Sequence, residues 1–165
     1  MAARTLTPAP REWFEGAPRY GSYEGDLGAI EWNRFVPNPL SRVAKEKRWL
    51  YLALSTERFY IAVCVVRLGY ASNAFTYVFD KEARALRVHQ SATSHPLAAS
   101  ISSNITEGSR VVFETSSLRV RCIRLSGSAT YALDVATSGF SLNAELDTSS
   151  APPSIAAIAP LAPGR

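Results

Sequence analysis

The fold of this chain is decided by residues 49–66, WLYLALSTERFYIAVCVV. Two apolar runs, Trp49 to Leu54 and Phe59 to Val66, flank the polar link Ser55 to Arg58. Short runs rich in aromatic and β-branched side chains are typical of strands, and a short polar link between two of them is typical of a hairpin. Both runs are apolar on both faces, which is expected of strands that are covered on two sides.

The same rhythm continues along the chain. Further apolar runs separated by turn residues are Ala74 to Phe79, Ala85 to His89, Arg110 to Thr115, Leu118 to Leu125, Ser128 to Val135 and Phe140 to Leu146. Regular short strands without a long helical pattern favour an all-β domain. We therefore predict an antiparallel meander of about eight strands that forms a barrel or a half-open sandwich.

The phase of the alternation predicts finer detail. Within the run from Leu118 to Leu125 the apolar positions change from even to odd at Cys122 and Ile123, which predicts a β-bulge there. Leu86 and Val88 are predicted to share one face of their strand, because they are two residues apart.

The ends of the chain differ from its middle. Residues 1–19 are proline-rich and predict an extended N-terminal arm, in which Trp13 and Phe14 would attach to the body. Residues 20–147 form the predicted β domain. Residues 148–165 are rich in proline and alanine and predict a C-terminal tail or a truncated linker.

Composition narrows the function classes. The 165 residues carry 18 lysines and arginines against 14 aspartates and glutamates, which favours a solvated surface over a nucleic-acid footprint. No apolar stretch is long enough to span a membrane, and the N-terminus lacks the apolar core of a secretory signal, so a cytoplasmic location is expected. Cys64 and Cys122 are interpreted as two buried thiols, with a cross-strand disulfide or a reactive thiol as alternatives.

Catalytic and metal motifs give little signal. His89 and His95 are the two histidines, and their spacing does not match a metal site. No Gly-x-Ser-x-Gly nucleophile motif and no glycine-rich phosphate loop occurs in the sequence. We therefore predict neither a metal nor a cofactor. Glu24, Asp26 and Glu31 are the carboxylates considered for proton transfer, with solvated turns as the alternative.

The predicted ligand-binding residues combine cations with aromatic rings: Lys47, Arg48, Trp49, Tyr51, Phe75 and Tyr77. Cations at the mouth of a barrel can hold a carboxylate or phosphate head while rings contact an apolar tail. Arg42 and Lys45 extend the positive cluster. The alternatives are a solvated loop for the cations and core packing for the stripe of Phe75, Tyr77 and Phe79.

Several short motifs occur in a recognisable order: Tyr20 to Gly25, Ile30 to Arg34, Pro39-Leu40, Lys45 to Trp49, Leu68 to Ser72, and an aromatic strand that ends in Phe79-Asp80. In this order the chain resembles the bacterial domain of unknown function (DUF) 2804 family, over about Tyr20 to Leu161. The resemblance covers roughly the N-terminal half of the family pattern, and it implies a second β-rich half. It also implies a fold-level similarity to the lipocalin-like superfamily of tocopherol cyclases and carotenoid hydratases.

Three functional hypotheses follow. The first is a barrel that holds a small apolar or amphipathic ligand, such as a lipid or an isoprenoid, with Lys47 and Arg48 at its mouth. The second is one half of a cyclase- or hydratase-like enzyme, in which carboxylates or tyrosines protonate a double bond. The third is a structural or interaction module that self-associates or needs a second β-rich half.

Overall fold

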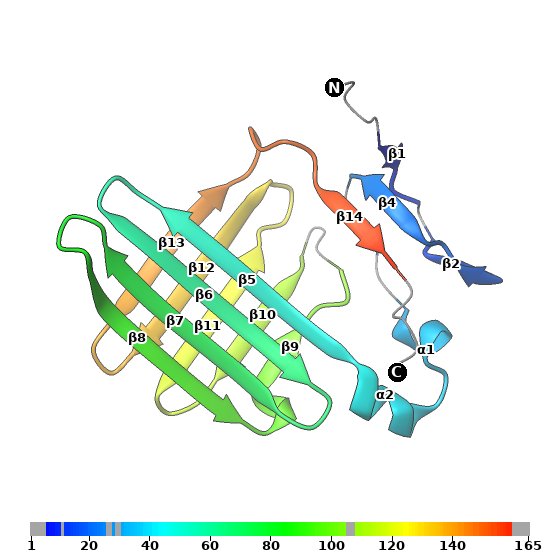
Figure 1. The fold of residues 1–165 in the computed structure, drawn as a ribbon, viewed down its shortest axis with the longest axis horizontal. Helices are drawn as coiled ribbons and strands as arrows, with labels where there is room; N and C mark the ends of the chain where they lie inside the picture. The colour runs from blue at the N-terminus through cyan, green and yellow to red at the C-terminus, as the bar shows by residue number, and fades with distance from the viewer. Residues whose placement is uncertain (1–5, 11, 26–27, 29–30, 105–107, 160–165) are drawn as a thin grey trace.

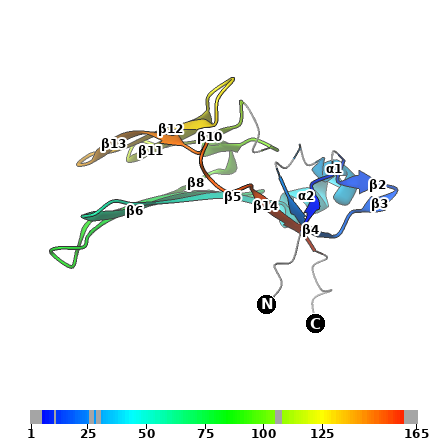
Figure 2. The same cartoon turned by 90° about the horizontal axis from the view of Figure 1, so that it is seen from above.

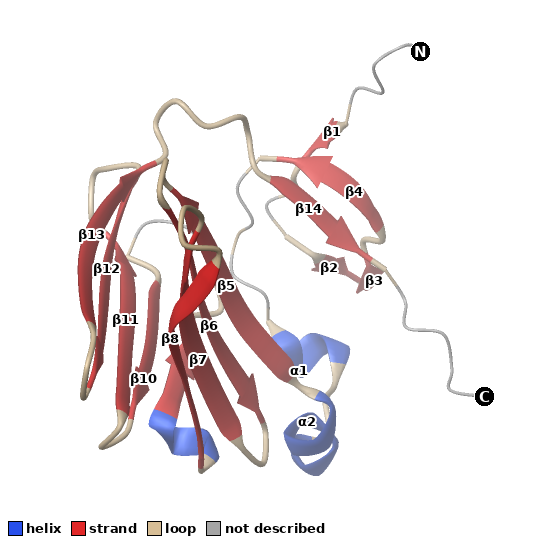
Figure 3. Ribbon diagram, turned by 60° about the vertical axis from the view of Figure 1, so that its left-hand side comes forward, coloured by secondary structure: helices blue, strands red, loops and turns tan. Residues whose placement is uncertain are grey.

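The computed structural model describes residues 6–10, 12–25, 28, 31–104 and 108–159 and shows two β-sheets stacked face to face (Figures 1 and 3). The first sheet contains β5 (Lys47–Ser55), β6 (Phe59–Leu68), β7 (Ser72–Asp80) and β8 (Ala85–Ser94), in the order β5-β6-β7-β8. The second contains β9 (Ala99–Ile101), β10 (Arg110–Glu114), β11 (Leu118–Arg124), β12 (Thr130–Thr137) and β13 (Ser141–Asp147), also in meander order.

The predicted all-β fold is confirmed. All strand pairs in the two large sheets are antiparallel, and each of the eight predicted runs coincides with one strand between β5 and β13. Of the two predicted forms, the sandwich is the one observed, because the two sheets keep separate edges and do not close into a barrel. Figure 2 shows them as two layers.

The core lies between the two layers. Side chains from β6 and β7 meet side chains from β10, β11 and β12, and the central buried residues are Val63, Val65, Ala74, Val111, Phe113, Leu118, Val120, Cys122, Leu133 and Val135. Phe113 is fully buried and is the largest of these side chains. Burial of apolar surface between the sheets is the main term that stabilises the fold.

The bulge was predicted in β11 but is observed in β8. The pairing of β11 with β10 and β12 runs without a register shift through Cys122 and Ile123. The shift lies instead between Val78 and Phe79, where Val78 pairs with Val88 and Phe79 pairs with Leu86. One extra residue in β8 therefore places Leu86 and Val88 on opposite faces, contrary to the prediction.

A smaller sheet lies beside the sandwich (Figure 1) and joins segments from the two ends of the chain. Strand β4 (Gly21–Glu24) pairs in parallel with β1 (Thr7–Pro8) and antiparallel with β14 (Ile155–Ile158). The short strands β2 (Phe14–Glu15) and β3 (Ala17–Pro18) form a separate pair. Both terminal regions thus contain strands, although an extended arm and a tail were predicted. Trp13 is buried and packs edge-on against Tyr23, as expected of an arm that is attached to the body.

Short helices connect the small sheet to β5. They are α1 (Trp32–Phe35) and α2 (Pro39–Lys45), and a 3-10 turn, η1 (Pro96–Ala98), precedes β9. The sequence signal for α2 is Asn38-Pro39: the Asn38 side chain accepts from Leu40 N and Ser41 N, and proline suits the first helical turn. Gly69 allows α2 to approach the β6–β7 turn, since a Cβ at this position would lie 1.8 Å from the Val43 carbonyl oxygen.

The two cysteines are free thiols on different sheets. Cys64 lies on β6 and Cys122 on β11, and both are buried. Burial raises the pKa of Cys122 to about 11 and raises the pKa of Cys64. Two buried thiols were predicted, and the structure confirms this interpretation over a disulfide.

Thr76 is a local defect in the core. Its side chain is fully buried, and its Oγ1 has no hydrogen-bond partner among the described residues. A buried hydroxyl without a partner costs about 1–3 kcal/mol.

Replacing Thr76→Val should therefore stabilise the protein by about 1 kcal/mol, because valine keeps the shape and removes the unpaired hydroxyl. Urea unfolding followed by circular dichroism measures the change. Thr93→Val is the matched control, since the Thr93 hydroxyl accepts from Asn73 Nδ2 at 2.9 Å and its loss should not stabilise. An unchanged or lower midpoint for Thr76→Val would contradict this account of Thr76.

Asp80 ties two turns together at one end of the first sheet. Its Oδ1 accepts from Glu82 N at 3.1 Å and Ala83 N at 3.0 Å, and its Oδ2 lies 3.1 Å from Arg58 Nη2 and 3.3 Å from Arg87 Nη2. The bond from Ala83 N, together with the two guanidinium groups, lowers the pKa of Asp80 to about 2, although burial opposes this shift. The Phe79-Asp80 motif thus has a structural role.

Asp80→Asn should lower the urea midpoint at pH 7, because the amide cannot pair with the guanidinium groups as a carboxylate does. A lowered folded-state pKa means that the stabilisation is present above the unfolded pKa of about 3.9 and is lost as the pH falls toward 2. The difference between wild type and Asp80→Asn should therefore shrink between about pH 4 and pH 2. Glu145→Gln, on the exposed side of β13, should show no such difference. A pH-independent gap for Asp80→Asn would refute the assignment.

Candidate functional site

The side of the first sheet that points away from the core is lined with rings. We call this side of β5–β8 the aromatic face, and its rings are Trp49, Tyr51, Tyr60, Phe75, Tyr77 and Phe79. They face outward because strand residues alternate, and their neighbours Leu50, Leu52 and Leu54 pack against the core. Figure 1 looks onto this face, and Figure 2 shows no other element in front of it.

Strand register brings the rings into one cluster. Tyr51 pairs with Cys64, which pairs with Phe75, and Ala62 pairs with Tyr77 in the next row. The ring centroids of Phe75 and Tyr77 lie 6.4 Å apart, and those of Tyr51 and Phe75 lie 6.5 Å apart. Ala62 and Cys64 are buried although they point to this side, so the rings around them cover the centre of the face.

The hydroxyl groups of the cluster also meet. Tyr51 Oη lies 3.5 Å from Tyr60 Oη, and the Tyr60 and Tyr77 rings stack with centroids 6.0 Å apart. Hydrogen bonding to Tyr60, and then to Tyr77, raises the pKa of the Tyr51 phenol. The Tyr51 hydroxyl therefore stays neutral over the physiological pH range.

Large apolar side chains on the aromatic face are exposed to solvent. Trp49 is 67% exposed, Tyr51 48% and Leu86 53%. The outward positions described for these four strands carry little charge. They include Lys47, at one end of β5, and His89 on β8. An exposed apolar surface of this kind is uncommon on a monomeric protein.

The outward side of the second sheet has the opposite character. Arg119 Nε lies 3.0 Å from Asp134 Oδ1, and Arg121 Nη2 lies 3.2 Å from Glu114 Oε2. The outward positions of β13 are the polar residues Ser141, Asn143, Glu145 and Asp147. One sheet therefore presents a surface suited to water, whereas the other presents rings.

Five of the six predicted ligand-binding residues lie together on the aromatic face: Lys47, Trp49, Tyr51, Phe75 and Tyr77. Arg48 lies on the other side of β5, where its Nε contacts Glu46 Oε1 at 2.5 Å and its Nη1 donates to the Ile101 carbonyl at 3.1 Å. The five residues on the aromatic face line the outside of a sheet and not the mouth of a barrel. Tyr60 and Leu86 were not predicted to be members of the face, because only strand register reveals their positions.

A cleft of about 300 Å³ lies between α2 and the β6–β7 turn. Its lining residues are Pro39, Arg42, Val43, Glu46, Arg67, Leu68 and Gly69. Glu46 is paired with Arg48, whereas no ion pair within the described chain engages the guanidinium groups of Arg42 and Arg67. The cleft thus combines two cations with an apolar wall.

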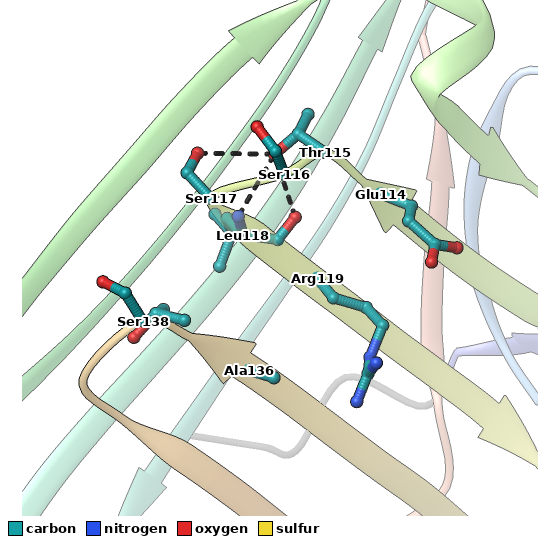
Figure 4. A pocket seen from close by; sticks show the side chains of 9 residues that line it. Glu114, Thr115, Ser116, Ser117, Leu118, Arg119, Ala136 and Ser138 are labelled. Atoms are coloured by element: carbon teal, nitrogen blue, oxygen red, sulfur yellow. Dashed lines mark hydrogen bonds between the residues drawn. The ribbon is translucent and has the colours of Figure 1, made fainter.

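A second cleft, of about 230 Å³, lies beside the β10–β11 and β12–β13 turns (Figure 4). Hydroxyl groups dominate its lining, but they hold the turns: Thr115 Oγ1 accepts from Leu118 N at 3.1 Å, and Thr137 Oγ1 accepts from Gly139 N at 3.3 Å. Its charged residues Glu114 and Arg119 are paired with neighbours on the sheet. This cleft is explained by turn structure.

The carboxylates considered for proton transfer are not gathered at either cleft. Glu24 lies in β4 of the small sheet, Glu31 pairs with Arg34, and Asp26 lies outside the described residues. Within the described ranges, no three histidine, cysteine, aspartate or glutamate side chains come close enough to hold a metal ion. The helices that the structure describes are all too short or too polar to cross a membrane.

Comparison with known proteins identifies the family. The family described as "Domain of unknown function (DUF2804)" matches residues 16–165. The chain belongs to this family, as the motif order indicated. No curated protein and no solved structure matches the chain, so the predicted likeness to the lipocalin-like superfamily stays a prediction.

Proposed function

We propose that this member of the DUF2804 family is an interaction module that binds a protein partner through the aromatic face. The observation that carries the proposal is the contrast between the two outward surfaces of the sandwich. The second sheet carries two ion pairs, Arg119–Asp134 and Arg121–Glu114, whereas the first sheet exposes Trp49, Tyr51 and Leu86. Aromatic enrichment with depletion of charge is characteristic of the centre of a protein interface.

The position of the two clefts and the ring cover of the face favour a protein over a small molecule as the partner. Small ligands bind in concave pockets that cover most of their surface. Both clefts lie elsewhere on the described chain, and the rings already cover Ala62 and Cys64. A broad apolar sheet surface is better matched by another broad apolar surface, as in the stacking of two sheets.

Photo-crosslinking tests this function directly. With p-benzoylphenylalanine in place of Tyr51, irradiation of cells of the source organism should give a covalent adduct to a polypeptide, because a bound partner would lie against this ring. The same group in place of Ser141, on the charged outward surface, is the matched control and should give little adduct. Equal labelling from both positions, or no adduct from position 51, would refute the proposal.

A second candidate function, binding of a small amphipathic anion, is supported by the cleft beside α2. Arg42 and Arg67 offer guanidinium groups that form no ion pair with the described residues, and Val43 and Leu68 supply an apolar wall. Guanidinium groups bind carboxylate and phosphate groups through paired hydrogen bonds. A lipid or isoprenoid head group with a short tail is the chemistry that fits this combination.

Titration calorimetry with decanoate tests the second candidate. Decanoate should bind the wild-type chain, and Arg67→Gln should weaken binding at least tenfold, about 1.4 kcal/mol, because one guanidinium is lost. Arg110→Gln, an exposed change on β10, is the control and should leave binding unchanged. Absence of heat with wild type, or equal affinity in Arg67→Gln, would eliminate this candidate.

A further inference from the structure

We infer that the partner of the aromatic face is a second copy of this chain, bound face to face about a two-fold axis. The inference rests on the proposed function and names its partner. It joins two sandwiches into a stack of four sheets, with β5–β8 of one copy packed on β5–β8 of the other. Three features of the face support it: its area, the rings at its centre, and its small number of charged residues.

The size of the face matches the need of a stable dimer. Four strands spaced about 4.8 Å apart, with about nine residues each rising about 3.4 Å, give a footprint of roughly 600 Å². The accessible area of a surface covered with side chains is larger than its flat footprint. Standard stable interfaces bury about 800 Å² per partner, so this one sheet supplies the required area without help from other elements.

The ring cover at the centre of the face suits contact with a second copy. A two-fold interface uses the same patch on both subunits, so the patch must be complementary to itself. At the centre of the aromatic face Phe75 and Tyr77 stack, and Ala62 beside them is fully buried, so the centre presents apolar ring surface. Two such sheets pack readily at about 10 Å separation with their strands nearly aligned.

Charge indicates where on the surface two copies can meet. The chain carries a formal net charge of +4, so two copies repel each other over most of their surface. The aromatic face is where this cost is smallest, since Lys47 lies at one end and the Tyr51 region is neutral. An acidic peptide or a nucleic acid would find few cations on this face to attract it.

Light scattering coupled to gel filtration tests the inference on the full chain. Wild type at micromolar concentration should elute with twice the 18.0 kDa mass of one chain. Tyr51→Lys should shift the protein to the single-chain mass, because two lysines would be buried against each other near the axis. Ser141→Lys adds the same charge to the other outward surface and should leave the dimer intact.

The folded state of each variant is checked by its urea midpoint, and Tyr51 is half exposed, so Tyr51→Lys is expected to fold. A single-chain mass for wild type, or a dimer that survives Tyr51→Lys, would overturn the inference. The photo-crosslinked adduct at position 51 separates the two ideas. An adduct of twice the chain mass supports the second copy, an adduct to a different polypeptide overturns it while the interaction function stands, and no adduct overturns both.

Discussion

The structure depends on the need of strand β6 for cover on both of its faces. Four successive residues, Ala62 to Val65, are buried, so neither side of this strand tolerates water. On the inner side the second sheet provides the cover, through Val120 and Val135 among others. On the outer side the chain has only the rings of β5 and β7 to provide it. The aromatic face therefore originates in a structural need, and its function follows from how much apolar surface that cover leaves exposed.

This origin explains why the outward surfaces of the two sheets differ. In β11 and β12 the outward residues Arg119, Arg121 and Asp134 are ion-paired, and the fully buried residues Leu118, Val120 and Val135 point inward, so the second sheet needs cover mainly on one side. At the centre of β6 the outward residues Ala62 and Cys64 are small, and large rings from neighbouring strands cover them. Large rings that cover small residues keep their own outer surfaces in solvent. A sheet built this way gains further apolar burial only from another molecule.

Much of the fold could be predicted from the sequence, because strand alternation and turn residues are local signals. All eight large strands were predicted, and their boundaries differ by a few residues. Pairings between distant segments, such as β4 with β14, have no local signal and were missed. The bulge was misplaced for a related reason: the change of phase at Cys122 reflects Ile123 facing outward, and the true shift beside Phe79 depends on which residue of β8 is left unpaired.

Part of the candidate site could likewise be predicted from local signals, and part could not. The sequence predicted the association of Trp49, Tyr51, Phe75 and Tyr77, because residues two apart share a face and hairpin neighbours share a sheet. It could not tell the inner side from the outer one, since both sides of β5 and β6 are apolar. Arg48 illustrates this: it adjoins Lys47 in the chain but lies on the opposite side of the sheet, against the Ile101 carbonyl. The cleft that Arg42 and Arg67 line could not be predicted from the sequence, because it depends on the approach of α2 to Gly69.

The pairing of β14 with β4 has a mechanical consequence. Strand β14 is close to the last described residue, and β1, which pairs with β4, is close to the first, so the small sheet connects the two terminal segments in space (Figure 1). A pulling force applied at residues 6 and 159 would load the β1–β4 and β4–β14 hydrogen bonds before it reached any strand of the sandwich. The small sheet thus acts as a clasp that must open first, while the two large sheets remain unloaded behind it.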